Sequence, residues 1–348
     1  MRYTYAANSQ EVLPDPLRRR WAIGLPLLAC GLLAVPANKA EDVVRLSQAL
    51  MGTQVDITLQ GKDRALLSEA ALIAFAEMIR LADMMSRYKS DSALNAVNLM
   101  AGLQAVSIPE ELMRVLLMAQ AMAKTSGGAF DATVGAFRNW NFSPEYPLVP
   151  DAAQLQAQCL LVDPKGLVLD VQAGTAYLDR RGMRLDLGGV AKLPILQAGL
   201  RILHECGISN AMLNGGGDVL VMGTLNEKPW RIGLRHPLKP QSLLGTVEIS
   251  HGFVASTGDY ERFLTYKGRR FHHILNPRTG YPTTGLHGVT LISEQMEDIN
   301  GLGPALMVSG VSEGGSMLAE RTGVDALMVD HQGKTWLTAG MSRRLKTV

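Results

Sequence analysis

The densest group of polar residues in this chain lies between residues 256 and 282. Ser256-Thr-Gly-Asp-Tyr260 is followed by Phe271-His-His-Ile-Leu-Asn-Pro-Arg-Thr-Gly-Tyr-Pro282, where proline and glycine impose turns that present side chains on irregular backbone. A histidine can transfer protons near neutral pH. Because neighbouring residues of a strand point to opposite faces, we expect only one of His272 and His273 to reach a given site, so they make a poor metal pair. The alternative is a structural histidine satisfied within a turn.

A glycine turn that leads into a helix is the second place where chemistry is expected. Gly188 and Gly189 let a bulky ligand approach the backbone, and leucines with helical spacing follow them. Pro194 is tolerated in a first turn, so the helix is predicted to begin within residues 190–193. Its free N–H groups, together with Lys192, would seat an anion such as a phosphate.

Two features beside this turn bear on its interpretation. Asp186, just before the turn, can accept hydrogen bonds from a sugar or a base edge, and a second glycine run follows at Asn214-Gly-Gly-Gly-Asp218. A glycine pair taken alone is equally well explained as a tight connection between a strand and a helix.

The elements that position these residues are predicted from hydrophobic periodicity. Helices are expected over residues 65–85 and 109–124, the second capped by Ser107, and another begins at Pro304; residues 141–157 are expected to form a loop. An alternating pattern at residues 43–59 predicts a strand. Further strands are predicted over residues 162–183, 210–213, 219–222, 230–234, 244–249, 252–256 and 289–293, with a hairpin at 263–269 and a closing pair at 323–329 and 333–337.

This order of elements predicts the fold class. Strands outnumber helices, and hairpin signals outnumber crossovers, which favours an α+β fold with mixed or mostly antiparallel sheets flanked by helices over a doubly wound fold. The chain has 348 residues, of which 47% are hydrophobic, and a net charge of +2. No basic block indicates a nucleic-acid partner.

The first forty residues are predicted to be an export signal. Arg18-Arg-Arg20 precedes the apolar run Trp21–Ala34, which is typical of a twin-arginine signal. Cleavage near Ala37 is favoured; a lipobox that would lipidate Cys30 and a retained, uncleaved anchor are the alternatives. The protein is therefore expected in the periplasm or otherwise exported, with a membrane contact only through the signal or a lipid anchor at the inner membrane.

Several motifs, taken in order, resemble those of the ApbE-like FAD:protein FMN transferases, from about residue 45 to the end of the chain. They are Met51-Gly-Thr, Ser86-Arg-Tyr, Gly127-Gly-Ala-Phe-Asp, Leu185-Asp-Leu-Gly-Gly-Val-Ala-Lys-Leu, Asn214-Gly-Gly-Gly-Asp, Ser256-Thr-Gly-Asp-Tyr-Glu-Arg-Phe and His272-His-Ile-Leu-Asn-Pro-Arg-Thr-Gly-Tyr-Pro. The resemblance implies a single catalytic domain over residues 41–348 with a T-fold-like α+β architecture.

The resemblance also implies an activity and a set of site residues. The activity is the Mg²⁺-assisted transfer of FMN from FAD to a threonine or serine hydroxyl of a partner flavoprotein. His273 falls on the family's catalytic histidine, and Gly189 on a carbonyl ligand of the metal. The FAD contacts fall on Met51, Tyr88, Ala129, Phe130, Asp131, Asp186, Lys192 and Ile274.

The chain departs from the family pattern at the other metal ligands. Asn300 stands in place of an aspartate and Pro304 in place of a threonine; Asp298, two residues upstream of Asn300, is the carboxylate that could substitute. Mg²⁺ prefers oxygen ligands and usually takes at least one carboxylate. The alternatives to a transferase are therefore a non-catalytic FAD-binding protein, serving as a flavin carrier or redox accessory, and a FAD pyrophosphatase.

Overall fold

The computed structural model describes residues 41–143, 145–239 and 241–347. The predicted export signal, with its arginines and Cys30, lies outside the described residues.

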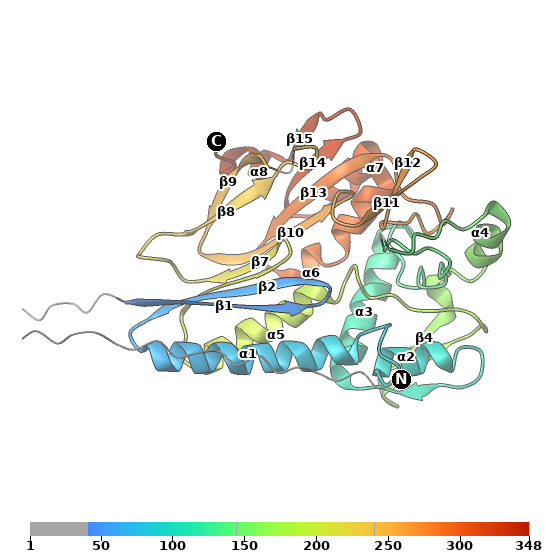
Figure 1. Cartoon of the computed structure of the whole chain (residues 1–348), viewed down its shortest axis with the longest axis horizontal. Helices are drawn as coiled ribbons and strands as arrows, with labels where there is room; N and C mark the ends of the chain where they lie inside the picture. Colours follow the sequence, from blue (N-terminus) through green and yellow to red (C-terminus); the bar gives the residue numbers. More distant parts are fainter. Residues whose placement is uncertain (1–40, 144, 240, 348) are drawn as a thin grey trace, which may run out of the picture. The chain divides into compact units, whose positions relative to one another are not determined.

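A large antiparallel sheet forms the centre of the fold, and every neighbouring pair of strands in it runs antiparallel. In sheet order its eight strands are β1 (Asp42–Leu50), β2 (Thr53–Gly61), β6 (Asn210–Gly215), β7 (Asp218–Met222), β10 (His251–Gly258), β13 (Leu286–Ser293), β14 (Asp325–Asp330) and β15 (Thr335–Leu337). Figure 1 shows this sheet with helices packed against it. The predicted α+β class with mostly antiparallel sheets is confirmed.

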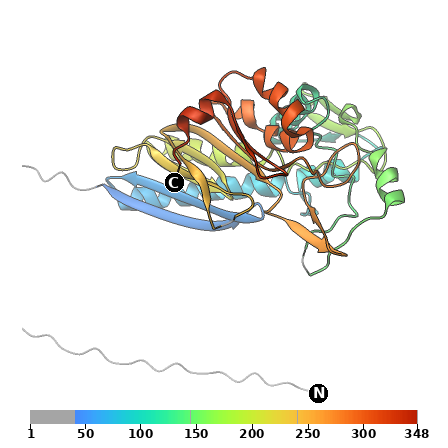
Figure 2. The same cartoon turned by 90° about the horizontal axis from the view of Figure 1, so that it is seen from above.

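Three smaller sheets surround the central one. They are the three-stranded β3 (Val106–Ser107), β5 (Thr175–Leu178) and β4 (Leu167–Asp170), and the two hairpins β8 (Trp230–Arg235) with β9 (Leu243–Ile249) and β11 (Phe263–Tyr266) with β12 (Arg269–His272). The β11–β12 hairpin projects from the body in the second view (Figure 2). It follows β10 in the chain, so it places the histidines near the carboxyl end of that interior strand.

The helices cover the sheet and carry the glycine turns. They are α1 (Arg64–Met84), α2 (Ala93–Leu99), α3 (Glu110–Thr125), α4 (Ala152–Cys159), the single 3₁₀ turn η1 (Pro164–Gly166), α5 (Lys192–Glu205), α6 (Met296–Ile299), α7 (Leu302–Ala319) and α8 (Ala339–Arg344). Helices α1 and α5 lie side by side against β1, β2 and β6 (Figure 1). A Cβ atom at Gly199 of α5 would lie 2.7 Å from Met78 Sδ of α1, so the glycine permits this close packing.

Two hydrophobic cores occupy the two faces of the sheet. The larger one joins α1, α3, α5 and α7 to residues such as Ile57 and Leu213. A smaller core lies between the sheet and the β8–β9 hairpin and includes Trp230, Val247 and Met341 of α8. Because both faces are covered, the sheet is a rigid base for the segments that leave its strand ends.

Some predicted boundaries were wrong. The single strand predicted over residues 43–59 is the hairpin β1–β2, because Met51 and Gly52 adopt φ of 54° and 71° and reverse the chain. The predicted loop at 141–157 contains most of α4, which the side chains of Asp151 and Gln154 cap reciprocally. Helix α3 has Pro109 at its N-cap rather than Ser107, and α2 had not been predicted.

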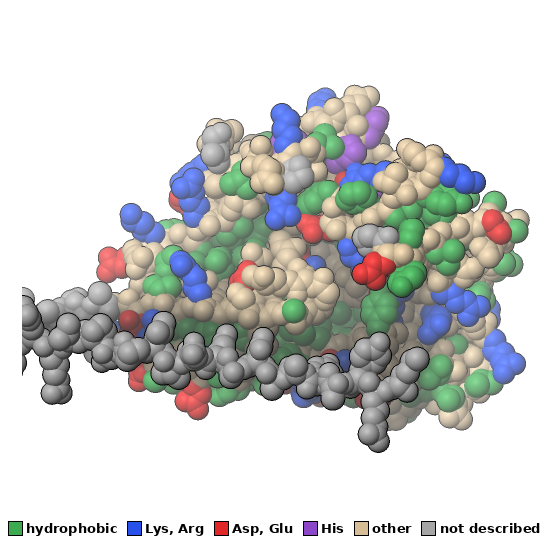
Figure 3. Space-filling view, in the orientation of Figure 1, with side chains coloured by type: hydrophobic (Ala, Val, Ile, Leu, Met, Phe, Trp, Pro, Cys, Tyr) green, Lys and Arg blue, Asp and Glu red, His purple; other side chains and the backbone are tan. Residues whose placement is uncertain are grey.

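The face of the molecule shown in Figure 3 carries no dominant charge. In the face shown by Figure 3, lysine, arginine and acidic side chains are interspersed with hydrophobic ones. Among the described residues, no helix combines the length and hydropathy needed to cross a membrane.

Candidate functional site

One cavity of about 440 Å³ brings together nearly all of the residues singled out in the sequence. Segments from the whole length of the chain line it, from the β1–β2 turn to the start of α7. The predicted residues among its lining are Met51, Tyr88, Ala129, Phe130, Asp131, Asp186, Gly189, Lys192, His273, Ile274 and Asn300. Asp298 is the exception: it does not line the cavity, and its carboxylate accepts a hydrogen bond from Ser293 Oγ at 3.2 Å.

The glycine turn and the first turn of α5 form one wall. Gly188 and Gly189 are exposed to the cavity, and the Gly188 amide donates to Asp186 Oδ1 at 2.8 Å. Helix α5 begins at Lys192, with Pro194 in its first turn, as predicted; its N-cap, Ala191, has no side-chain capping bond. The N-terminus of α5 therefore has no side-chain cap at its N-cap position, and its positive dipole end faces the cavity.

Helix α7 presents a second uncapped N-terminus to the same cavity. Its N-cap is Gly301, which has a φ of 79° and no side chain to cap the helix. Gly301, Gly303 and Pro304 all line the cavity. The N-terminal ends of α5 and α7 thus share one cavity, which favours a ligand with negative charge.

Two ion pairs hold the charged side chains of this wall. Lys192 Nζ lies 3.1 Å from Asp218 Oδ2, and Arg87 Nη1 lies 2.9 Å from Asp186 Oδ2. Asp218 also accepts a hydrogen bond from the Ser256 amide at 3.1 Å, so its carboxylate is fixed to β10. Lys192 is therefore oriented by Asp218 and keeps donors for a ligand, since an ammonium group has three.

The two neighbouring histidines have different surroundings, as the strand argument predicted. His272 is buried; its Nε2 donates to the Thr283 carbonyl at 2.7 Å and its Nδ1 accepts from the Ile274 amide at 3.3 Å, so both nitrogens are used. His273 lines the cavity, and its Nδ1 lies 3.1 Å from the Arg262 carbonyl. A carbonyl oxygen only accepts, so Nδ1 carries the proton and Nε2 is left with a free lone pair.

Burial lowers the pKa of His273 to about 4, and the nearby charges of Arg262 and Lys192 act in the same direction. Burial also lowers the pKa of His272. A histidine with so low a pKa is neutral at physiological pH. His273 can therefore accept a proton at Nε2 as a general base, but it is not an imidazolium that could act as a general acid.

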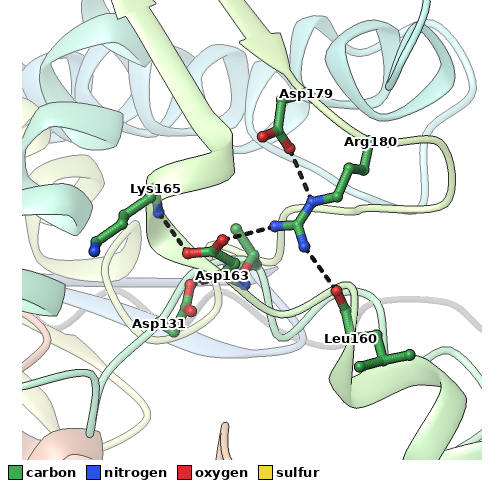
Figure 4. A network of polar contacts seen from close by, with 7 residues as sticks. Asp131, Leu160, Asp163, Lys165, Asp179 and Arg180 are labelled. Carbon is green, nitrogen blue, oxygen red and sulfur yellow. Dashed lines mark hydrogen bonds and ion pairs between the residues drawn. The ribbon is translucent and has the colours of Figure 1, made fainter.

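Asp131 is held by a polar network behind the cavity. Its Oδ1 accepts from the Thr133 amide at 2.7 Å and from Thr133 Oγ1 at 2.8 Å, while burial raises its pKa. Thr133 in turn accepts from the Asp163 amide, and Asp163 pairs with Arg180 at 2.8 Å. Figure 4 shows Arg180 reaching from Asp163 to Asp179 and to the carbonyl of Leu160. The orientation of Asp131 is therefore fixed by groups that lie outside the cavity.

Aromatic and apolar residues complete the cavity. Tyr88 is 73% exposed, with the Arg87 guanidinium 4.9 Å from its ring centroid. The Phe130 ring lies against the glycine turn, since a Cβ at Gly189 would lie 3.0 Å from Phe130 Cε2. Met51, at the tip of the β1–β2 hairpin, also lines the cavity, although it is far from the glycine turn in the sequence. These side chains provide flat and apolar surface beside the charged wall.

The residues at the predicted metal position do not fit a Mg²⁺ ion. Asn300 is 3% exposed, and its Nδ2 faces Met118 Sδ at 3.5 Å. The ring of Pro304 lies against the glycine turn, with Cγ 3.3 Å from where a Gly189 Cβ would be. The donor set thus comprises a carbonyl and an amide without a carboxylate, and no cluster of three or more His, Cys, Asp or Glu suited to a metal exists among the described residues.

Three charged residues of the site were not assigned a role from the sequence. Arg87 lies between two motif residues, Asp218 ends the second glycine run, and Arg262 belongs to the 256–263 motif. Their positions in motifs were visible, but the ion pairs that place Arg87 and Asp218 depend on contacts between distant segments.

Comparison with known proteins agrees with this geometry. A sequence model of the ApbE family matches residues 51–328. The FAD:protein FMN transferase of Klebsiella pneumoniae (strain 342) is 31% identical over 290 residues, which cover 82% of this chain and 89% of that protein. The FAD:protein FMN transferase of Treponema pallidum (strain Nichols) is 28% identical and covers 94% of this chain and 96% of its own.

Solved structures show the same fold. The ApbE protein of Thermotoga maritima MSB8 superposes with a TM-score of 0.81 at 26% identity, covering 88% of this chain and 100% of that one. The flavin transferase ApbE of Vibrio cholerae gives a TM-score of 0.76 at 26% identity, with the same coverage. The family model, the relatives and the fold all lead to one conclusion: this chain belongs to the ApbE family.

Proposed function

We propose that this protein is a FAD:protein FMN transferase, which moves FMN from FAD to a threonine or serine hydroxyl of a partner flavoprotein. The observation that carries the proposal is the cavity in which two uncapped helix N-termini and Lys192 surround an exposed glycine turn. That arrangement suits a diphosphate. The relatives named above as FAD:protein FMN transferases identify the dinucleotide that would supply it.

FAD would lie with its diphosphate against Gly188, Gly189 and Lys192. The flat surfaces of Tyr88 and Phe130 are suited to its ring systems, because aromatic faces stack on other aromatic groups. Asp131 and Asp186 would accept hydrogen bonds from the polar edges of the dinucleotide. Met51 and Ile274 would contact its apolar edges.

The transfer is a phosphoryl substitution. The acceptor hydroxyl oxygen forms a bond to the phosphorus of the FMN half, and the bond from that phosphorus to the bridging oxygen breaks. The products are AMP, which leaves with the bridging oxygen, and FMN joined to the acceptor through a phosphoester. The hydroxyl proton passes to Nε2 of His273. This nitrogen can accept it because the imidazole is neutral and Nε2 has a free lone pair.

Positive charge near the diphosphate comes from the chain's own groups in this proposal. The set of ligands for Mg²⁺ is incomplete at Gly189 and Asn300, so no step is assigned to a metal. Lys192, Arg262 and the α5 and α7 N-termini line the cavity and stabilise the charge that develops on the phosphate oxygens.

A non-catalytic FAD-binding protein is the second candidate. The Asn300 and Pro304 pair favours it, because the carboxylate and hydroxyl that would hold a metal are replaced by an amide and a carbon ring. Such a protein would keep FAD intact as a carrier or redox accessory.

The deciding experiment incubates purified protein with FAD and a candidate acceptor flavoprotein, in one series with Mg²⁺ and in another with EDTA. Covalent flavin fluorescence on the denatured acceptor, with stoichiometric release of AMP, would support the transferase. Stoichiometric FAD binding without either product would instead establish the carrier. FMN and AMP released with no flavin on the acceptor would indicate a pyrophosphatase.

We also propose that the protein acts after export, either free in the periplasm or tethered to the inner membrane, on the strength of the arginines and apolar run within residues 18–37. Cell fractionation checks this, with Arg18-Arg19 replaced by lysines as the control. Retention of the wild-type protein in the cytoplasm would refute it.

A further inference from the structure

We call the cavity of about 440 Å³ described above the flavin cavity. A second cavity, of about 1100 Å³, adjoins it. It lies between residues 135–143 and 147–148, the segment before the glycine turn and the start of β11. The residues that line both cavities are Arg87, Tyr88, Trp140, Phe142, Glu261 and Arg262. A group that occupies the second cavity is therefore in direct reach of the first.

Unpaired positive charge distinguishes this second cavity. Within the described part of the chain, the guanidinium groups of Arg138, Arg184 and Arg262 form no ion pair with a carboxylate within 4.0 Å. The one acidic residue of the lining, Glu261, pairs with Arg235 at 3.4 Å. The cavity thus has an excess of cations that no acidic side chain of the described chain satisfies.

Apolar side chains stand beside these arginines. Tyr88 is 73% exposed, Leu148 is 53% exposed and Phe263 is 43% exposed, although all three are large and hydrophobic. Trp140 and Phe142 stack with ring centroids 5.4 Å apart in the wall between the two cavities. Exposed aromatic side chains next to arginines are typical of protein interaction surfaces.

We propose that this second cavity, which we call the arginine groove, binds the acceptor protein through an acidic segment that also carries apolar side chains. The inference rests on the proposed transferase function and names the chemistry of its protein substrate. Arg138 and Arg184, which line only this second cavity, bind carboxylates of the segment, and Leu148 and Phe263 contact its apolar side chains. The hydroxyl that receives FMN then enters the flavin cavity past Trp140 and Phe142.

The charge pattern favours a protein segment over the adenylate half of FAD as the occupant. In the proposed function the diphosphate binds at the glycine turn, which lines only the first cavity. Arginines spread along a groove match carboxylates spread along an extended chain, because each guanidinium can bind one carboxylate with two hydrogen bonds.

The test uses a fluorescein-labelled peptide in which one threonine is flanked by aspartates and leucines, and a twin peptide with asparagine at every aspartate position. Binding to the full-length protein saturated with FAD is followed by fluorescence anisotropy. We expect the aspartate peptide to bind about tenfold or more tightly than its twin, with an affinity that falls as salt rises. Arg138→Glu combined with Arg184→Glu should abolish this preference.

Neither arginine makes a side-chain hydrogen bond or ion pair within the described chain, so their replacement should leave the fold intact. Arg138→Gln with Arg184→Gln gives a milder variant that removes the charge alone, and an intermediate loss of binding is expected. The matched control is Arg45→Glu with Arg343→Glu, which changes the charge equally at exposed positions that line neither cavity.

The affinity for FAD, measured in the same samples by flavin fluorescence, separates the two proposals. Unchanged FAD binding with lost peptide binding supports the arginine groove. Weakened FAD binding in the Arg138 and Arg184 variants would assign the cavity to the dinucleotide and overturn the inference. So would equal binding of the two peptides, or no binding of either. Failure of the wild-type protein to bind FAD would instead remove the transferase proposal.

Discussion

Adjacent residues at the end of a strand can have unlike chemistry when their hydrogen-bond partners differ. His272 uses both ring nitrogens on the backbone at Thr283 and Ile274, whereas His273 uses only Nδ1, on the Arg262 carbonyl. The free Nε2 and the low pKa suit His273 to the role of general base that we propose for it. His272 instead links β12 to the segment at Thr283 and contributes to structure.

Replacement of His273 by glutamine should lower the rate of FMN transfer by about two orders of magnitude or more, which is the usual contribution of a general base. Binding of FAD should change little, because the side chain keeps its size and the anion seat is separate. Single-turnover transfer and flavin fluorescence measure the two effects. A variant that transfers at the wild-type rate would assign the proton to another acceptor. His272→Gln, the same substitution at the neighbouring residue, is the control variant, and it should lower thermal stability.

The pKa of about 4 for His273 also predicts a pH dependence. Transfer should lose its base only as the pH falls towards 4, so the rate should not drop near pH 6.5, the usual histidine value. The free energy of unfolding also depends on pH because of this lowered pKa. The unfolded chain binds a proton at this histidine between about pH 6.5 and 4 while the folded chain does not, so this contribution to the free energy of unfolding decreases as the pH falls through that window. Replacement of His273 by glutamine should remove this component.

Metal dependence can be tested at Asn300 and Pro304. We expect EDTA to have no effect on FAD binding by the wild-type protein, because the donor set lacks a carboxylate. Asn300→Asp combined with Pro304→Thr should introduce a Mg²⁺ dependence of FAD binding and transfer, seen by titration calorimetry. Asn300→Leu, which adds no oxygen ligand, is the control. Strong inhibition of the wild-type protein by EDTA would show that another set of ligands holds a metal.

Single residues were predictable from the sequence to the extent that local chemistry decides them. The turn at Gly188 and Gly189, the position of Lys192 and the separation of the two histidines follow from backbone rules. The pairing of Lys192 with Asp218 and of Arg87 with Asp186 joins segments far apart in sequence, and no local rule indicates it. Asp298 illustrates the opposite case: it is close to Asn300 in sequence, yet its side chain bonds Ser293 instead.

At the scale of elements, the site depends on a close approach of two loops. Val134 and Arg184 form a parallel bridge, and a Cβ at Gly135 would lie 2.6 Å from the Arg184 carbonyl oxygen and 2.7 Å from the Leu185 carbonyl carbon. These contacts join the segment of Phe130 and Asp131 to the segment of Asp186. Only glycine permits the two backbones to lie this close.

Gly135→Ala should therefore separate the two segments, because backbone atoms cannot move aside as a flexible side chain can. We expect a loss of stability of about 1–3 kcal/mol, as for other overpacked sites, and weaker FAD binding. Thermal unfolding and flavin fluorescence measure both. Gly315→Ala is the control, since a Cβ there meets nothing within 4 Å; alanine in the helix interior should leave stability unchanged or raise it by up to about 1 kcal/mol. Equal effects of the two substitutions would contradict this account.

The elements themselves were predicted best where the periodic pattern is long. Helices α1, α3 and α5 and most strands of the central sheet lie where hydrophobic spacing placed them. The β1–β2 hairpin was missed because Met51, which has a positive φ, is not a residue typical of such a turn. Helix α4 was missed because prolines surround it, although the Asp151 and Gln154 capping pair was present in the sequence.

At the scale of the whole molecule, FAD should stabilise the folded chain, because it binds a cavity that exists only when the fold is complete. A concentration about one hundred times the dissociation constant adds about 2.7 kcal/mol to the free energy of unfolding. For a protein of this size, that corresponds to an increase in Tm of roughly 4 °C. Differential scanning fluorimetry checks this, with AMP as the control ligand that lacks the flavin. An unchanged Tm with FAD would show that the cavity is not its site.

The walls of the flavin cavity come from segments between Met51 and Val308. During synthesis, a growing chain could not retain flavin until the start of α7 had left the ribosome, and a product truncated before that helix would stay colourless. Yellow colour in a freshly made sample would then mark the molecules whose synthesis and folding had gone nearly to the end.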